Sequence, residues 1–273
     1  MVQMKELSKI SSRDNAKLAM ARKVRDGKIG DQIFIEGLRL AEETLRSGLG
    51  VIECFVTPAF GESERGRELI EELKARNVLI SEVAGNLFRN VADTSNSQGI
   101  ILIGERPDNG MASIEEQINS GSSALVIFLN EINDPSNLGA VFRTAEAAGA
   151  AGIIISRNSV NVFSPKALRS AMGASLRVPV WENADLAKVM PWSRGHGLRT
   201  TAADTRAEIE YTQVDWNQPR LVIFGSEAHG LSREVLEMVD EVMLIPMQNG
   251  VESLNLAVSA GIILFEAVRQ RSN

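Results

Sequence analysis

The stretch IPMQNGVESLNLAVSAGIILFEAV, residues 245–268, contains the pattern that decides the fold. An apolar strand pattern ends at Pro246, and a long run without any charged residue follows from position 254 to position 265. A helix that is apolar on every side is expected to be buried, either in a sheet core or at a subunit contact. Ser253 and Asn255 stand where the chain enters this helix, and burying them costs free energy unless each finds a partner. A helix cap accounts for one of them and leaves the cluster unexplained.

The composition is that of an ordinary globular protein with room for two domains. The chain has 273 residues, of which 44% are hydrophobic and 23% are charged, so extensive disorder is not expected. Cys54 is the only cysteine, which excludes a disulfide framework and favours a cytoplasmic protein. The first ten residues contain no apolar signal segment, and the uncharged run near the carboxyl end is too short to cross a bilayer.

The charge is distributed unevenly along the chain. The net charge is −6, which weakly disfavours a nucleic-acid partner, but residues 1–28 carry eight basic and three acidic side chains. Such a local basic segment is suited to phosphate contact, whatever the total charge. A solvated amphipathic helix is the simpler interpretation of this segment when it is considered alone.

Two series of alternating strand and helix patterns divide the chain. The first series predicts a small α/β domain over residues 1–105, and residues 106–123 have the Pro, Gly, Asn and Ser content of a linker. A short helix capped by Ser113 is compatible with the middle of that linker. The second series, over residues 124–273, has nearly continuous apolar strands between helices, which indicates a mostly parallel sheet covered on both faces.

Ligands of parallel α/β sheets bind at the carboxyl ends of strands, and three such ends here are polar. The first, in LNEINDPSNLGAVFRTA (129–145), contains Asn137, a plausible N-cap, and Arg143, which we place early in the following helix. A cation in a first turn is slightly unfavourable against the helix dipole, so Arg143 weakly indicates an anionic ligand. A simple surface charge explains it equally well.

The second polar end is LVIFGSEAHGLS (221–232), and the third is the opening stretch. Gly225 follows an apolar strand, where the backbone either turns tightly or lets a ligand approach. Its spacing to Gly230 is that of a P-loop, but Leu231 stands where that motif needs lysine, which excludes this ATPase motif. No G-x-G-x-x-G, esterase elbow or metal-ligand spacing occurs. Glu227 alone could be a carboxylate that orders its own loop.

Together, and in this order, the three polar ends resemble the motifs of the SpoU-type (TrmH-like) RNA ribose 2′-O-methyltransferases of the SPOUT superfamily. NDPSNLGAVFRTA resembles the first motif, LVIFGSEAHGLS the second and IPMQNGVESLNLAVSAGIILFEA the third. The first domain is similar to the family's ribosomal-protein-like substrate-binding domain through SRDNAK, IFIEGLRLAEE and SNSQGIILIGE. The resemblance therefore covers nearly the whole chain.

This resemblance implies a fold, a cofactor and a set of site residues. The fold is a mostly parallel SPOUT domain with a deep trefoil knot, which strand periodicity alone would not suggest. The cofactor is S-adenosylmethionine, the substrate is RNA, no metal is needed, and the chain forms a homodimer through the knot helices. The implied residues are Gly225, Ile245 and Leu254 for the cofactor; Arg143, Asn137, Glu227, Ser253 and Asn255 for catalysis; and Arg13, Lys17, Arg22, Lys23 and Arg25 of the basic segment for RNA.

Several points stay open at this level. Because a guanidinium is normally protonated, Arg143 acts either as a stabiliser of the 2′-alkoxide or, with a strongly lowered pKa, as a base. Ala228 stands where the second motif often has glycine, and Gln248 and Asn249 have no implied role. Two-domain relatives mostly modify large-subunit ribosomal RNA, which we favour over tRNA. A non-catalytic RNA-binding module is the alternative, and a nucleotide-dependent oxidoreductase is a more distant one.

Overall fold

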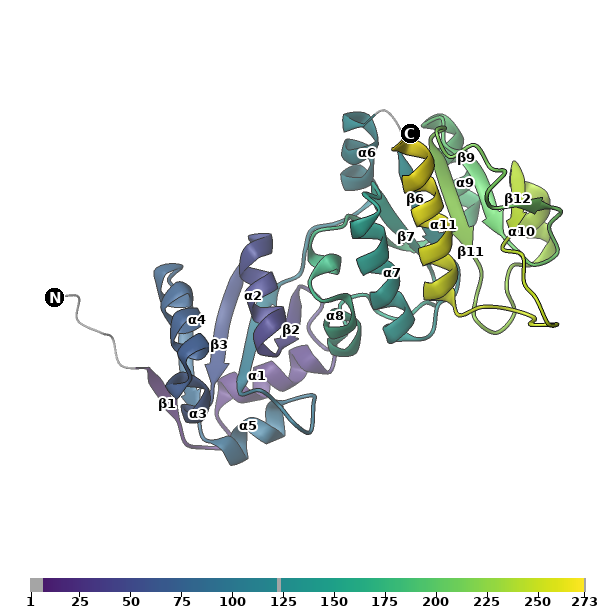
Figure 1. Ribbon diagram of the computed structural model, residues 1–273. Helices are drawn as coiled ribbons and strands as arrows, with labels where there is room; N and C mark the ends of the chain where they lie inside the picture. Colours follow the sequence, from purple (N-terminus) through teal and green to yellow (C-terminus); the bar gives the residue numbers. More distant parts are fainter. Residues whose placement is uncertain (1–6, 122–123, 273) are drawn as a thin grey trace. The chain divides into compact units, whose positions relative to one another are not determined.

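The computed structural model describes residues 7–121 and 124–272. The chain separates into two compact units, and most of their helices and strands are labelled in Figure 1. The first unit comprises the residues up to Pro107 together with Phe163–Leu176, and the second comprises Asp108–Val162 and the residues from Arg177 on.

The first unit is built on a five-stranded mixed sheet. Its strand order is β1-β4-β3-β5-β2, with β1, β3 and β4 parallel to one another and β5 antiparallel to both β2 and β3. The strands are β1 (Ser8–Ile10), β2 (Gln32–Glu36), β3 (Val51–Val56), β4 (Leu79–Val83) and β5 (Ile100–Glu105).

Helices cover this sheet through apolar stripes. Leu18, Ala21 and Val24 of the first helix form a core cluster with Phe34 and Phe55 of the sheet. The three helical residues are spaced by three, as expected for one buried helix face. The helices of the unit are α1 (Ala16–Arg25), α2 (Leu38–Ser47), α3 (Pro58–Glu62), α4 (Glu64–Ala75), α5 (Gly85–Val91) and α8 (Pro165–Ala171), followed by a 3-10 turn over Ala174–Leu176.

The boundaries between the two units differ from those that the predicted linker indicated. Residues 111–120 form helix α6 (Met111–Ser120), which starts after Gly110 rather than at Ser113 and buries Ile114 and Ile118 in the core of the second unit. Helix α8, expected within the methyltransferase domain, packs against β2 of the first unit. Its predicted cap, Ser164, is at the N-cap position, but its buried hydroxyl bonds to no described residue.

The second unit contains a seven-stranded sheet in which every described pairing is parallel. Its strand order is β10-β12-β9-β11-β6-β7-β8. Strands β6 and β11 have fully buried residues throughout, which explains why their sequences are continuously apolar. The strands are β6 (Leu125–Leu129), β7 (Gly152–Ser156), β8 (Val180–Ala184), β9 (Arg199–Ala203), β10 (Ile209–Glu210), β11 (Arg220–Phe224) and β12 (Glu241–Leu244).

Helices lie on this sheet in two groups. Residues of α6, α9 and α10 pack with Val126, Phe128 and Ile223 in one continuous cluster on one face. Helices α7 and α11 pack against each other and lie side by side in front of the sheet (Figure 1). The helices not yet bounded are α7 (Pro135–Ala147), α9 (Leu186–Gly195), α10 (Arg233–Met238) and α11 (Leu256–Arg271).

The uncharged run 254–265 had suggested a helix buried on every side, but α11 is not buried in this way within one chain. Ala260, Ile263, Leu264 and Ala267 are buried, but Phe265 is about half exposed at 49%. The helix therefore has a core-facing side and an apolar outer side. This outer side is consistent with the second expectation, a subunit contact, which no observation within one chain tests.

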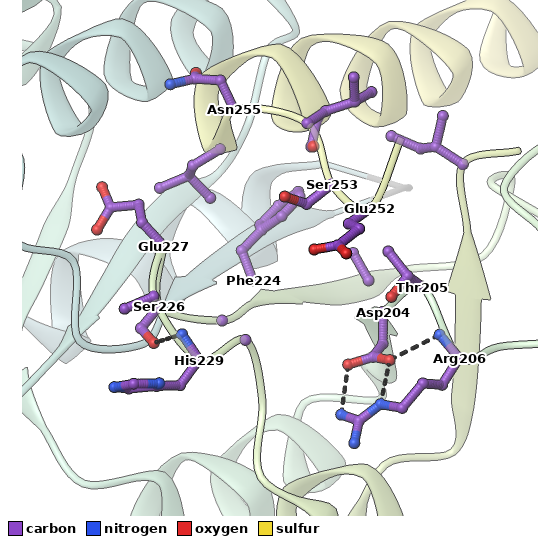
Figure 2. A pocket seen from close by; sticks show the side chains of 18 of the residues that line it. Asp204, Thr205, Arg206, Phe224, Ser226, Glu227, His229, Glu252, Ser253 and Asn255 are labelled. Atoms are coloured by element: carbon purple, nitrogen blue, oxygen red, sulfur yellow. Dashed lines mark hydrogen bonds and ion pairs between the residues drawn. The ribbon is translucent and has the colours of Figure 1, made fainter. Parts of the chain in front are cut away.

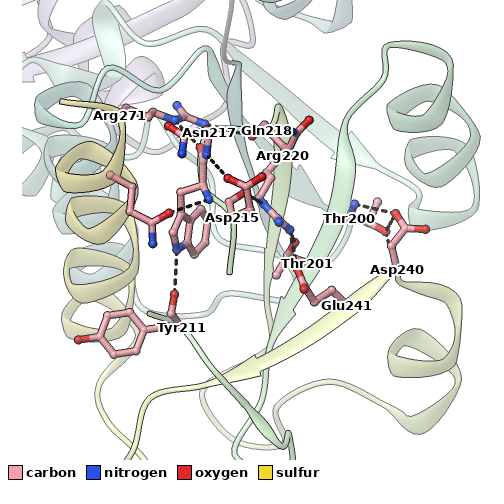
Figure 3. A network of polar contacts seen from close by, with 12 residues as sticks. Thr200, Thr201, Tyr211, Asp215, Asn217, Gln218, Arg220, Asp240, Glu241 and Arg271 are labelled. Carbon is pink, nitrogen blue, oxygen red and sulfur yellow. Dashed lines mark hydrogen bonds and ion pairs between the residues drawn. The ribbon is translucent and has the colours of Figure 1, made fainter. Parts of the chain in front are cut away.

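A buried arginine at the start of β11 connects neighbouring strands by hydrogen bonds (Figure 3). Arg220, 1% exposed, donates from Nη1 to Glu241 Oε2 and to Thr201 Oγ1, both at 2.6 Å, and from Nε to the Asp215 carbonyl at 2.8 Å. Burial and the nearby charge of Arg220 lower the pKa of Arg271, which anchors the end of α11 by donating to the Trp216 carbonyl. This network holds three strands and the last helix in register at the end opposite the polar loops.

The predicted class, an α/β protein with a mostly parallel sheet in its second half and a smaller α/β part before it, is confirmed. The trefoil knot stays a prediction. None of the described helices combines the length and the apolar character that a bilayer crossing needs.

Candidate functional site

Four neighbouring strands of the second unit end at one cavity. Strands β12, β9, β11 and β6 are adjacent and parallel, so the loops that follow them emerge at the same edge of the sheet. The cavity between these loops has a volume of about 620 Å³, within the range of small-molecule sites. Figure 2 shows the side chains around it. Seven of the eight predicted catalytic and cofactor residues line it: Asn137, Gly225, Glu227, Ile245, Ser253, Leu254 and Asn255.

The loop after β11 folds tightly back on itself. Ser226 and Gly230 exchange backbone hydrogen bonds of 3.2 and 2.9 Å, and the Ser226 hydroxyl accepts from the backbone N–H of His229. A Cβ atom on Gly225 would overlap the backbone of Gly230 and Leu231. Of the two reasons that the sequence offered for this glycine, the tight turn is therefore the one that applies within the chain.

The loop after β12 leaves backbone groups free at the cavity. Asn249 and Gly250 both have positive φ, and Val251 donates to the Gln248 carbonyl at 3.3 Å, so residues 248–251 form a turn that suits Asn-Gly. This turn explains Asn249, whose positive φ suits asparagine, whereas nothing in the structure explains the side chain of Gln248. On either side of it, the backbone groups of Ile245 and Leu254 make no hydrogen bond with any described residue.

A chain of amide and carboxylate side chains joins the three predicted motifs. Asn255 donates from Nδ2 to Asn137 Oδ1 at 2.9 Å, and Asn137 donates from Nδ2 to Glu227 Oε1 at 3.0 Å. Glu227 also accepts from the backbone N–H of Asn133 at 3.3 Å through Oε2. Asn255 is at the same time the N-cap of α11, because its Oδ1 accepts from the N–H of Ala257 at 2.9 Å. Asn255 thus both caps α11 and lines the cavity.

Two further polar side chains have no partner in the chain. Glu252 and Ser253 are exposed, line the cavity and form no side-chain hydrogen bond or ion pair with any described residue. Figure 2 shows both side chains directed into the cavity. Ser253 is thus exposed at the cavity, not buried as the sequence had suggested.

Arg143 is the one predicted catalytic residue that does not line the cavity of a single chain. Helix α7 begins at Pro135 and is capped by Asp134, so Arg143 lies in its third turn and Asn137 in its first turn. The predicted N-cap role of Asn137 and the helix-dipole argument for Arg143 are both wrong. The Arg143 side chain is exposed and makes no hydrogen bond or ion pair with residues 7–121 or 124–272.

The five predicted RNA-binding residues of the first unit fall into two groups. Lys17 forms an ion pair with Glu53, and Arg25 donates to the Val91 carbonyl at 3.0 Å and to Asp26. These two side chains therefore have structural partners. Arg13, Arg22 and Lys23 form no side-chain hydrogen bond or ion pair within the part of the chain that the structure describes.

The sequence interpretation missed the loop after β9. Asp204, Thr205 and Arg206 follow a strand that lies between β11 and β12, and all three line the cavity. The rule that ligands bind at the carboxyl ends of parallel strands applies equally to this strand and would have found them.

Two other expectations concern metal ions and Ala228. Among the described residues, no group of three or more His, Cys, Asp or Glu is arranged to hold a metal ion. Ala228 is exposed, lines the cavity and has no positive φ, so the loop accommodates its methyl group without backbone strain.

Comparisons with known proteins agree with this geometry. The sequence profile of the SpoU rRNA methylase family matches residues 124–265, and the profile for RNA 2′-O ribose methyltransferase substrate binding matches residues 34–110. An uncharacterized tRNA/rRNA methyltransferase from Synechocystis sp. is 32% identical over 269 residues, covering 97% of this chain and 95% of that protein.

Two solved structures are similar over almost the whole chain. An AdoMet-bound rRNA methyltransferase from Sinorhizobium meliloti superposes with a TM-score of 0.82 and 25% identity, covering 96% of this chain and 98% of that one. An RNA 2′-O ribose methyltransferase superposes with a TM-score of 0.81 and 26% identity, covering 97% and 100%. On the evidence of both halves of its sequence, the chain belongs to the SpoU rRNA methylase family.

Proposed function

We propose that this protein transfers a methyl group from S-adenosylmethionine to a ribose 2′-hydroxyl of large-subunit ribosomal RNA. The observation that carries the proposal is the hydrogen-bonded series Asn255–Asn137–Glu227 at the rim of the cavity. It brings together side chains that are 118 residues apart in sequence, beside a cavity of cofactor size. A protein that only bound RNA would have no evident use for such a combination.

The cavity fits the chemistry of S-adenosylmethionine. Phe224, Met243 and Leu256 give it an apolar lining suited to an adenine ring, and the free backbone groups of Ile245 and Leu254 can bond to polar edges. Two solved structures of similar fold are described as AdoMet-bound or in complex with AdoMet. We therefore assign the cofactor to Gly225, Ile245 and Leu254, as the resemblance implied.

When bound, the cofactor would supply an electrophilic methyl group from its sulfonium sulfur and would leave as the thioether S-adenosylhomocysteine. The protein must position the ribose while the 2′-hydroxyl passes its proton to solvent water. Asn137 is held on both sides, by Asn255 and by Glu227, and can orient the ribose by hydrogen bonding. Ser253 offers a free hydroxyl at the same rim. Although Arg143 does not line the cavity of its own chain, we assign to its positive charge the stabilisation of the 2′-alkoxide as it forms.

The Arg143→Ala variant tests the catalytic part of this proposal. Loss of one preorganised charge is expected to lower kcat by about 10²–10³-fold, while the affinity for S-adenosylmethionine stays nearly unchanged because Arg143 does not line the cavity. Methyl transfer to RNA and cofactor titration measure the two quantities, with Lys188→Ala on the exposed part of α9 as the control. Equal losses of both would contradict the assignment.

RNA docking on the first unit is tested at the three basic residues without partners. Changing Arg13, Arg22 and Lys23 to Glu should weaken RNA binding and flatten its dependence on salt, because fewer counterions are released on binding. Lys74→Glu on α4 is a single charge reversal on another helix of this unit and is compared with each of the three single variants. An unchanged affinity in the triple variant would refute the docking role.

We also propose that the chain forms a homodimer through α11. Val258 and Phe265 lie two helical turns apart on its outer side, and both are about half exposed, at 51% and 49%. Exposed large apolar side chains on a helix without charged residues up to position 265 favour a protein contact. Phe265→Glu should give monomers in analytical ultracentrifugation; an unchanged dimer would exclude this surface.

The RNA target is the last part of the proposal. The likeness over nearly the whole chain to a structure described as an rRNA methyltransferase supports ribosomal RNA over tRNA. Mapping of ribose methylation in total RNA with and without the gene identifies the nucleotide. A site lost from tRNA alone would overturn the ribosomal assignment.

A further inference from the structure

Asp204 and Arg206, after β9, form an ion pair that belongs to the cavity but not to the three predicted motifs. The role derived for it below rests on the proposed cofactor site. Arg206 donates from Nε to Asp204 Oδ1 at 2.7 Å and from Nη2 to Oδ2 at 2.8 Å, which is a two-pronged arrangement. The backbone N–H of Arg206 also donates to Asp204 Oδ1 at 2.9 Å. Three hydrogen bonds thus fix this short turn.

The pair is anchored to the sheet on one side. The backbone N–H of Asp204 donates to the Met243 carbonyl at 2.9 Å, so the turn is tied to β12. The Asp204 side chain is only 7% exposed, and its hydrogen bond from Arg206 holds the pKa of Asp204 below its usual range. Three hydrogen bonds stabilise the charged form of the Asp204 carboxylate and fix its position.

On its other side, the pair reaches the loop after β11. Arg206 Nη2 donates to the carbonyl of Leu231 at 2.9 Å. Leu231 is buried, and the backbone of residues 230–231 packs directly on Gly225. Arg206 therefore holds the last residues of the 225–231 loop, which also contains Gly225 and Glu227.

Direct contact between Arg206 and a ligand is not what the geometry favours. Nε and Nη2 both donate to acceptors within the chain, and Figure 2 shows the guanidinium joined to the Asp204 carboxylate by hydrogen bonds. Glu252 and Ser253, in contrast, are directed into the cavity. The side chain acts on the site through the loop.

We propose that Arg206, held by Asp204, is a positioning residue that fixes the 225–231 loop in the form that accepts the adenosine part of the cofactor. Without the Arg206 side chain, the Leu231 carbonyl loses this hydrogen-bond donor. The loop then adopts more conformations, and only some of them can bind the cofactor. Affinity then falls with the populated fraction of the competent form.

The variants are Arg206→Ala and Arg206→Lys, with Arg233→Ala as the control, since Arg233 forms only an exposed ion pair with Glu237. Titration calorimetry with S-adenosylhomocysteine and with 5′-methylthioadenosine measures binding. We expect Arg206→Ala to weaken both by the same factor, about tenfold or more, which is the usual effect of losing a hydrogen bond to a charged group. Lysine cannot bond to Asp204 and Leu231 as a planar fork does, so it should recover only part of the loss.

Hydrogen exchange in the absence of cofactor gives an independent measurement. Arg206→Ala should speed exchange in residues 225–231 and leave the strands of the sheet unchanged. Faster exchange throughout the second unit would mean general destabilisation and would overturn the positioning role. Full recovery of binding by lysine would do the same.

The two ligands separate positioning from direct contact. 5′-Methylthioadenosine lacks the amino-acid tail, so a loss confined to S-adenosylhomocysteine would mean that Arg206 binds the tail carboxylate, and the inference would be wrong. A wild-type protein that bound neither ligand would instead refute the proposed cofactor, whereas normal binding by Arg206→Ala refutes only the role of this arginine.

Discussion

Glu227 orients Asn137 in the proposed mechanism, and its replacement gives the sharpest test of the site. Its carboxylate accepts two hydrogen bonds, from Asn137 Nδ2 at 3.0 Å and from the Asn133 N–H at 3.3 Å. Hydrogen bonds to charged groups contribute about 1.5–3 kcal/mol, and exposure of Glu227 puts this pair at the lower end. If losing these hydrogen bonds raises the activation free energy by about 1.5 kcal/mol, kcat falls about tenfold.

The comparison of Glu227→Gln with Glu227→Ala separates orientation from proton transfer. Glutamine keeps one acceptor oxygen, so it can still bond to Asn137, and we expect its kcat to lie between those of the wild type and the alanine variant. If Glu227 were the base for the 2′-hydroxyl, the glutamine variant would fall as far as alanine, by about 10²-fold or more.

Methyl transfer from labelled S-adenosylmethionine at saturating RNA measures kcat, and thermal unfolding measures stability. Because Glu227 is exposed, its loss should lower the melting temperature by less than about 3 °C. Equal kcat values for glutamine and alanine, or an unchanged kcat in both, would refute the orienting role.

Three further predictions concern the sheet and its loops. Glu241→Gln removes the carboxylate that pairs with the buried Arg220, and urea denaturation should show a loss of about 3 kcal/mol in the free energy of unfolding. Gly225→Ala places a Cβ against Gly230, so calorimetry should show cofactor binding lost without unfolding of the sheet. The hydrogen bond from Arg206 lowers the pKa of Asp204, so its stabilisation is present above the unfolded pKa and is lost as the pH falls through the folded pKa. The difference in melting temperature between the wild type and Asp204→Asn should therefore be constant from about pH 6 to 8 and shrink below about pH 4.

Much of the fold could be predicted from local patterns. The apolar strands around Ile127, Ile154 and Val222 have the continuous pattern of a doubly covered sheet, and they occur as parallel strands. Helix α6 was only partly recognised, because Gly110 and Asn119 give its sequence the composition of a linker while Ile114 and Ile118 bury its inner face. Composition is a weak guide where two apolar residues decide the packing.

The placement of α8 could not be predicted from sequence. Its sequence lies between elements of the second unit, but its buried residues Ala167, Leu168 and Ala171 belong to a helix that packs on β2. A small apolar stripe on a helix can pack on any sheet of suitable shape. Tertiary packing, not the local sequence, therefore decides which unit α8 joins.

For the site, the sequence determined the kinds of residue and the strand ends at which they occur. The order of the three motifs drew attention to Asn137, Glu227 and Asn255, which the structure joins by hydrogen bonds, while the cofactor role of Ile245 stays a proposal. Only the tertiary structure decided that these side chains bond to one another, that Arg143 lies in the third turn of α7 and that Arg206 holds the neighbouring loop. The physical reason is that local patterns fix helices, strands and turns, whereas contacts across 90 or 118 residues depend on the order of strands in the sheet.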